Sequence, residues 1–177
     1  GSEMIKLLAA PDPAPALAFM AQTGVLARIF PGADTTFLGP LVHLEQLVGV
    51  NPDPMARLAA LGGDDVANRL RLSRSDQKRG ESIRIQSAST FGAKAIGHIA
   101  GEQAGLGAVL LRAAMTNTPL KAAVIAAVRD GAKAVFPIKA NDLPHLEGKK
   151  LGDALSTLKK DWLASDLVKT KNQLLEQ

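Results

Sequence analysis

The stretch LGAVLLRAAMTNTPLKAAVIAAV, residues 106–128, decides the fold class. Its two halves are rich in alanine and leucine, which are strong helix formers, and a TNTP segment separates them. Threonine is a good N-cap, and proline in a first helical turn loses no hydrogen bond, so Thr118 and Pro119 predict the start of a second helix. We therefore expect residues 106–115 and 120–128 to form an antiparallel helix pair.

The segment before this pair is harder to assign, because glycine recurs throughout residues 80–105. Each glycine weakens a helix by about 1 kcal/mol relative to alanine. Ile96, Ile99 and Ala100 nevertheless keep one helical face. Because glycine lets two backbones approach closely, we expect tight helix-on-helix packing in this segment.

Helical segments separated by breaking residues continue towards the amino terminus. We expect a helix over residues 3–10 that ends at Pro11, and a second helix capped by Asp12 with Pro13 in its first turn. Gly24 ends the second helix, and a further helix covers residues 36–48. Asp53 is predicted to cap a helix over residues 54–61. The next two helices are expected to begin at Asp64 or Asp65, and at Ser73 or Ser75.

Towards the carboxyl terminus, residues 131–144 are predicted to be irregular. Apolar side chains then recur at helical spacing and end at Trp162, which predicts an amphipathic helix. A last helix is expected over residues 169–175. The 177 residues suffice for one or two domains, and the predicted fold class is all-α without a sheet.

Composition excludes several classes of function. The chain has no cysteine, which excludes disulfides, thiolate metal sites and a cysteine nucleophile, and which fits a cytoplasmic location. No apolar run approaches the length of a membrane span, so no membrane partner is expected. His43, His98 and His145 are too scattered to predict a metal site, and no phosphate-binding P-loop motif occurs.

Positive charge is clustered along the chain, although the formal net charge is only +4. Seven lysine and arginine residues lie between residues 69 and 94, and two lysine pairs follow at residues 149–150 and 159–160. Clustered cations release counterions from a phosphate backbone on binding, which favours a nucleic-acid partner. The alternative interpretation of each cation is a solvated helix face.

Two segments resemble the neck and the carboxy-terminal block of bacterial CCA-adding tRNA nucleotidyltransferases and poly(A) polymerases. The first contains EMIKLL at residues 3–8 and GVLARIFP at residues 24–31, similar to the family's Glu-x-x-Lys-Leu-Leu helix and Gly-Leu-Leu-x-x-Leu-Pro step. The second contains FPIKANDL at residues 136–143 and KKLG at residues 149–152, similar to the family's Gly-x-Asp-Leu element and the loop after it. Ala140 stands where the family has glycine.

This resemblance implies a multi-helix array of the neck, body and tail type, without the catalytic head. Residues 1–2 look like a tag remnant, so we expect the natural sequence to continue upstream. Residues 3–79 would be the neck and 80–177 the body and tail, or both would form one continuous domain. Nucleotidyl transfer needs an Asp-x-Asp pair that holds two Mg²⁺ ions, and the chain has none. Mg²⁺ and CTP or ATP therefore belong to the head, and we expect the chain alone to be inactive.

The partners implied are the acceptor stem and T-arm of tRNA, together with the protein's own head. Duplex RNA is bound mainly through phosphates and 2′-hydroxyls, which suits cations on rigid helices, and an aromatic content of 3% disfavours base stacking. The candidate RNA contacts are Lys139, Lys149 and Lys150 in the irregular carboxy-terminal loop, then Arg69, Arg71 and Arg74, then Lys159 and Lys160. The alternative function is a helical protein-interaction or oligomerisation module. Whether the parent enzyme adds CCA or poly(A) stays open.

Overall fold

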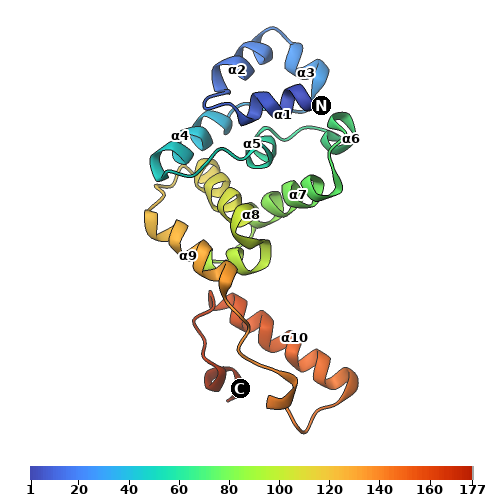
Figure 1. Cartoon of the computed structure of the whole chain (residues 1–177), viewed down its shortest axis with the longest axis vertical. Coiled ribbons are helices and arrows are strands. Elements are labelled where there is room, and N and C mark those ends of the chain that lie inside the picture. The colour runs from blue at the N-terminus through green and yellow to red at the C-terminus, as the bar shows by residue number, and fades with distance from the viewer. Residues whose placement is uncertain (177) are drawn as a thin grey trace.

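The computed structural model describes residues 1–176, which fold into helices joined by short loops (Figure 1). This range holds eleven α-helices and no strand, so the all-α prediction is confirmed. One isolated antiparallel bridge pairs Ala33 with Gly62. Within the same range, no helix has the length and apolarity that crossing a membrane requires. The helices are α1 Ser2–Ala9, α2 Ala14–Gln22, α3 Val25–Ile29, α4 Leu38–Val48, α5 Pro54–Leu61, α6 Val66–Leu70, α7 Arg74–Ala88, α8 Ala93–Thr116, α9 Ala122–Lys133, α10 Gly148–Ala164 and α11 Lys171–Leu175, with a 3₁₀ turn at Ala140–Asp142.

Helices α8 and α9 form the predicted antiparallel pair, and glycine sets their separation. A Cβ atom on Gly97 would lie 2.1 Å from the carbonyl oxygen of Val128, and one on Gly131 would lie 1.9 Å from that of Lys94. Both distances are far below van der Waals contact, so only glycine fits at either position. The close packing expected from the glycine-rich segment is therefore confirmed.

The predicted start of α9 at Thr118 and Pro119 is wrong, because both residues lie in the loop after α8 and the N–H of Thr118 bonds back to that helix. Asn117 adopts a left-handed conformation with φ of 49°, and the backbone N–H of Thr118 donates to the Ala113 carbonyl at 3.0 Å. This arrangement closes the last turn of α8. Helix α9 begins only at Ala122, after an extended Lys121.

Four helix starts show where local chemistry is decisive. The side chains of Asp53 and Ser73 accept from the N–H groups of Met55 (2.9 Å) and Asp76 (3.1 Å), as predicted. Asp12 accepts from Ala14 at 3.1 Å, but Pro13 precedes α2 instead of lying in its first turn. Neither aspartate of the 64–65 pair is seen to cap α6, because Asp65 takes a left-handed conformation and its carboxylate accepts from the Asn68 side chain.

A buried ion pair fixes α1, α4 and α5 to one another. Arg57 is fully buried, and its guanidinium donates to the Glu45 carboxylate from Nε at 2.9 Å and from Nη2 at 2.7 Å. The same group donates to the carbonyl oxygens of Leu8 (2.7 Å), Ala10 and Pro11 (3.3 Å). Arg57 therefore satisfies carbonyl groups at the end of α1 that have no partner within the helix. Burial raises the pKa of the Glu45 carboxyl, and the hydrogen bonds from Arg57 oppose this rise.

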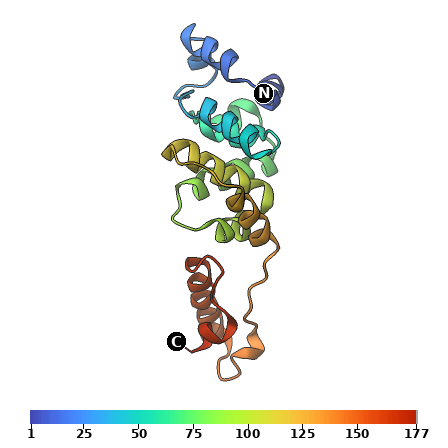
Figure 2. The same ribbon diagram turned by 90° about the vertical axis from the view of Figure 1, so that its left-hand side faces the viewer.

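The molecule is elongated and has two lobes (Figure 2). The N-terminal lobe, residues 1–133, holds two clusters of buried apolar side chains. The C-terminal lobe, residues 134–176, has a separate cluster around Ile138, Trp162 and Leu174. The suggested domain boundary after residue 79 lies inside α7, which packs on both α5 and α8. The buried apolar clusters of the two lobes are separate on either side of the end of α9.

A few contacts hold the lobes together. The Asp166 carboxylate accepts from the backbone N–H of Ala95 in the first turn of α8 at 2.8 Å, which caps this helix from a residue 71 positions away. The ring of His98 lies edge-on to Trp162 with a centroid separation of 5.0 Å, and its Nδ1 is 3.1 Å from the Ala134 carbonyl oxygen.

Asp166→Ala is expected to loosen the junction between the lobes, because the first turn of α8 loses its only capping carboxylate within residues 1–176. Loss of a helix cap costs about 1 kcal/mol. The expected results are a small fall in the free energy of unfolding and faster proteolysis between residues 133 and 140. Asp12→Ala removes an exposed carboxylate from a helix start outside the junction. Faster cleavage at residues 133–140 in both variants would contradict a specific role for Asp166.

Candidate nucleic-acid interface

All eight basic residues predicted to contact RNA are exposed at the surface. Within residues 1–176, none of the eight forms a salt bridge. Other cations are neutralised, such as Arg129 by Glu102 (3.1 Å) and Lys169 by Asp161 (2.6 Å). The eight side chains therefore keep their charge available for an external anion.

The structure divides the eight residues into two separate groups. Arg69, Arg71 and Arg74 lie where α6 meets α7 in the N-terminal lobe, and the five lysines lie on the C-terminal lobe (Figure 1). We call these the arginine group and the lysine group. A partner that contacts both groups must extend along the long axis of the molecule.

The lysine group is centred on α10. Lys149 and Lys150 lie in the first turn of this helix, so their predicted place in an irregular loop is wrong, although Lys139 does precede the 3₁₀ turn. Residues eleven apart differ by about 20° around a helix and by about 16 Å along it, so Lys149 and Lys160 share one line. This line faces away from Leu155, Leu158 and Trp162, which pack into the core of the lobe. Lys150 and Lys159 flank it on either side.

The first turn of α10 is an unusual place for two lysines. A helix carries partial positive charge at its amino terminus, so each cation there is disfavoured by about 0.3–1 kcal/mol. Glu147 precedes the helix, but no side-chain hydrogen bond within residues 1–176 caps it. Two lysines and uncapped N–H groups thus lie at the same end of α10, and both kinds of group favour phosphate at a helix terminus.

The Asp142 carboxylate holds the loop before α10 in place and leaves the side chain of Lys139 exposed. Lys171 donates to the Asp142 carboxylate at 2.6 Å, and the backbone N–H of Lys139 donates to the same carboxylate at 2.8 Å. These two hydrogen bonds, that from Lys171 foremost, lower the pKa of the Asp142 carboxyl. The loop is therefore anchored through a backbone group of Lys139, and its ammonium group makes no salt bridge within the described residues.

The arginine group occupies a corner of the backbone. Arg69 is in the last turn of α6, Arg71 follows in a left-handed conformation with φ of 51°, and Arg74 is the first residue of α7. The Ser73 cap and the hydrogen bond from the N–H of Leu72 to the Ala67 carbonyl (2.9 Å) fix this corner. Three cations are thus carried on a short and well-bonded segment.

The sequence patterns did not predict that two arginines, Arg57 and Arg112, bond to groups within the fold. Arg57 lies in α5 among residues that are nearly all apolar and buried, and a charged residue within such a segment was the available signal for a buried pair. Arg112 donates to the carbonyl oxygens of Gln86, Ser87, Ser89 and Phe91 at 2.7–3.1 Å, and burial lowers the pKa of its guanidinium. Both residues hold the fold together and are not offered to a partner.

Among residues 1–176, no three histidine, aspartate or glutamate side chains gather closely enough to hold a metal ion. His98 is engaged in the contact between the lobes. No family model, curated protein or solved structure matches the chain.

Proposed function

We propose that this chain is the RNA-binding helical region of a CCA-adding tRNA nucleotidyltransferase, and that it holds the acceptor stem and T-arm of tRNA. The observation that carries the proposal is the start of α10, where Lys149 and Lys150 stand at an uncapped helix terminus. Two cations placed against the helix dipole lower the stability of the free protein, and a bound phosphate offsets this cost. The family assignment rests on the sequence resemblance alone.

The two separate basic groups also support an extended RNA partner. A duplex carries phosphates along its whole length, so cations at distant points of one elongated protein contact the same molecule. Lys149 and Lys160, roughly 16 Å apart along α10, would contact phosphates several nucleotides apart. Such contacts position a duplex without identifying its bases.

The Lys149→Ala/Lys150→Ala double variant is expected to bind a tRNA transcript more weakly and with a smaller salt dependence. Each phosphate contact contributes about 0.9 to the slope of log affinity against log salt concentration, so the slope should fall by about 2. The free energy of unfolding should rise slightly, because two unfavourable charges leave the helix terminus. Filter binding at several salt concentrations and urea denaturation measure the two effects.

The matched control is Lys121→Ala/Lys133→Ala, which removes the same net charge from two exposed lysines, one just before α9 and one at its end. This variant should keep the salt slope of the wild-type protein. An equal loss of slope in both double variants would show that total charge governs binding and would contradict a specific site at α10.

A second candidate function is a protein-interaction module, favoured by apolar side chains exposed on α2 and α3. Phe19 is 66% exposed, and Val25 and Ile29 are each about 40% exposed. Contact through such a face responds little to salt, whereas RNA binding through phosphates weakens steeply as salt rises. Sedimentation of the free chain at low and high salt, with and without tRNA, separates the two functions.

A further inference from the structure

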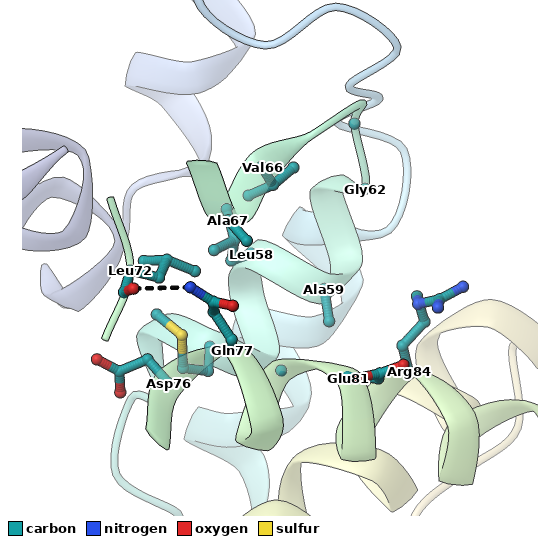
Figure 3. Close-up of a pocket in the computed structure, with 13 residues that line it drawn as sticks. Leu58, Ala59, Gly62, Val66, Ala67, Leu72, Asp76, Gln77, Glu81 and Arg84 are labelled. Atoms are coloured by element: carbon teal, nitrogen blue, oxygen red, sulfur yellow. Dashed lines mark hydrogen bonds between the residues drawn. The ribbon is translucent and has the colours of Figure 1, made fainter. Parts of the chain in front are cut away.

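A groove of about 370 Å³ lies between α5, α6 and α7 in the N-terminal lobe (Figure 3). Its walls are apolar and come from Met55 and Leu58 on α5, Val66 on α6, and Leu72 before α7. Polar side chains of α7 run along one edge, with Asp76 at one end and Arg84 at the other. None of the residues assigned to phosphate binding above lines the groove. Leu72, which forms part of its wall, lies between Arg71 and Arg74 in the chain.

The polar edge offers both donors and acceptors. Gln77 donates to the Leu72 carbonyl at 2.9 Å through Nε2, which leaves its amide oxygen in the groove (Figure 3). Asp76 is engaged by Ser73 and Arg79. Glu81 and Arg84 are exposed, and neither forms a salt bridge within residues 1–176. One carboxylate, one amide oxygen and one guanidinium therefore remain for a ligand.

Gly80 keeps the α7 side of the groove open. A Cβ atom at this position would meet no other atom within 4 Å, although Gly80 lies in the interior of a helix of 15 residues. Because Gly80 also lines the groove, a side chain added there starts in open space at the groove wall. Gly80 thus gives a direct means to block the groove.

The size of the groove limits its occupant. A volume of about 370 Å³ is near the lower end of the range for small-molecule sites, which is enough for a nucleoside and too little for a helix or a duplex. The edge of a nucleobase carries donors and acceptors around a flat apolar face, and unpaired bases of folded RNA are bound in this way. Apolar walls with Gln77, Glu81 and Arg84 at the edge match that chemistry.

We propose that the groove between α5, α6 and α7 binds one unpaired nucleobase of the RNA whose phosphates the arginine group contacts. Arg71 and Arg74 hold the backbone beside the base, and the donors and acceptors of α7 meet its edge. This inference rests on the proposed RNA-binding function. The base-binding groove would add selectivity to that function, because phosphate contacts alone do not distinguish a folded tRNA from a plain duplex.

The test compares Gly80→Leu with Gly39→Leu in binding two RNAs. Gly39 is the matched control because it is also a helical glycine whose Cβ would meet no atom within 4 Å, and it lies on α4 outside the groove. The RNAs are a tRNA transcript without its CCA end, which has unpaired bases, and a blunt RNA duplex, which has none. Thermal melting confirms that both variants fold.

We expect Gly80→Leu to bind the tRNA about tenfold more weakly than the wild-type protein does, which is the size of effect of losing the hydrogen bonds to one base edge. Its affinity for the blunt duplex should not change, and Gly39→Leu should bind both RNAs as the wild-type protein does. Full tRNA affinity in Gly80→Leu overturns the groove proposal and leaves the RNA-binding function intact, as does an equal loss with both RNAs. A wild-type protein that binds neither RNA overturns both proposals.

Discussion

Arg57→Ala is expected to lower the free energy of unfolding by about 3–5 kcal/mol, the cost of leaving one member of a buried ion pair without its partner. The substitution strands the Glu45 carboxylate, which is 2% exposed, and removes the donor from three carbonyl groups at the end of α1. Urea denaturation followed by circular dichroism measures the change. Arg69→Ala is the control, because Arg69 is exposed and its loss should change stability by no more than about 0.5 kcal/mol.

The deficit of Arg57→Ala should shrink as the pH falls. Burial already raises the pKa of the Glu45 carboxyl in the wild-type protein, and the variant lacks the opposing hydrogen bonds and charge of Arg57, so its pKa rises further. A raised pKa in the folded state means that protonation stabilises the fold. This stabilisation is complete below the unfolded-state pKa of Glu45 and is lost as the pH rises through the folded-state value. A deficit equal at pH 4 and pH 7 would show that the stranded charge is not its cause.

Gly131→Ala is expected to destabilise the protein by about 3 kcal/mol, because the new methyl group would overlap the Lys94 backbone in a closely packed helix pair. Helix α9 must move away from α8, and this movement would separate the packed side chains of Ile96, Ile125 and Val128. A fall in the urea midpoint with an unchanged denaturant slope is the expected signature.

The same substitution at Gly80 should have the opposite sign. An alanine Cβ there meets no atom within 4 Å, and alanine is favoured over glycine in a helix, so Gly80→Ala should stabilise by up to about 1 kcal/mol. If Gly80→Ala also lost stability, the expected gain from helix propensity at an open position would be contradicted.

Local chemistry in the sequence predicted those elements whose ends depend on neighbouring residues. Asp53 caps the helix that starts at Pro54 because both groups lie within one turn of each other. The prediction of where α9 starts was wrong for a different reason. The TNTP segment has the residues of a helix start, but its backbone is used to close α8 through a left-handed Asn117. Two local solutions compete there, and in the structure the segment closes α8.

Contacts between segments that are distant in the chain could not be predicted from local sequence patterns. The pairing of Arg57 with Glu45 depends on how α4 and α5 pack. The carbonyl groups that Arg57 caps belong to the end of α1 and to the residues that follow it, more than 45 positions away. The candidate basic residues were recognised by charge, and their exposure follows from polarity. Their division into two groups follows from the position of the C-terminal lobe, which no local pattern encodes.

The separate core of the C-terminal lobe has a consequence for the dynamics of the chain. No apolar residue after Val128 belongs to either buried cluster of the N-terminal lobe, so opening of the smaller lobe exposes none of that interior. Backbone amides of α10 should then exchange their protons with solvent through local opening, whereas those of α8 beyond the first turn, which Asp166 caps, require global unfolding. The lysine group thus lies on a unit with its own opening equilibrium. A ligand that orders this unit would slow its amide exchange and that of the first turn of α8, which Asp166 caps, while leaving the interior of the larger lobe unchanged.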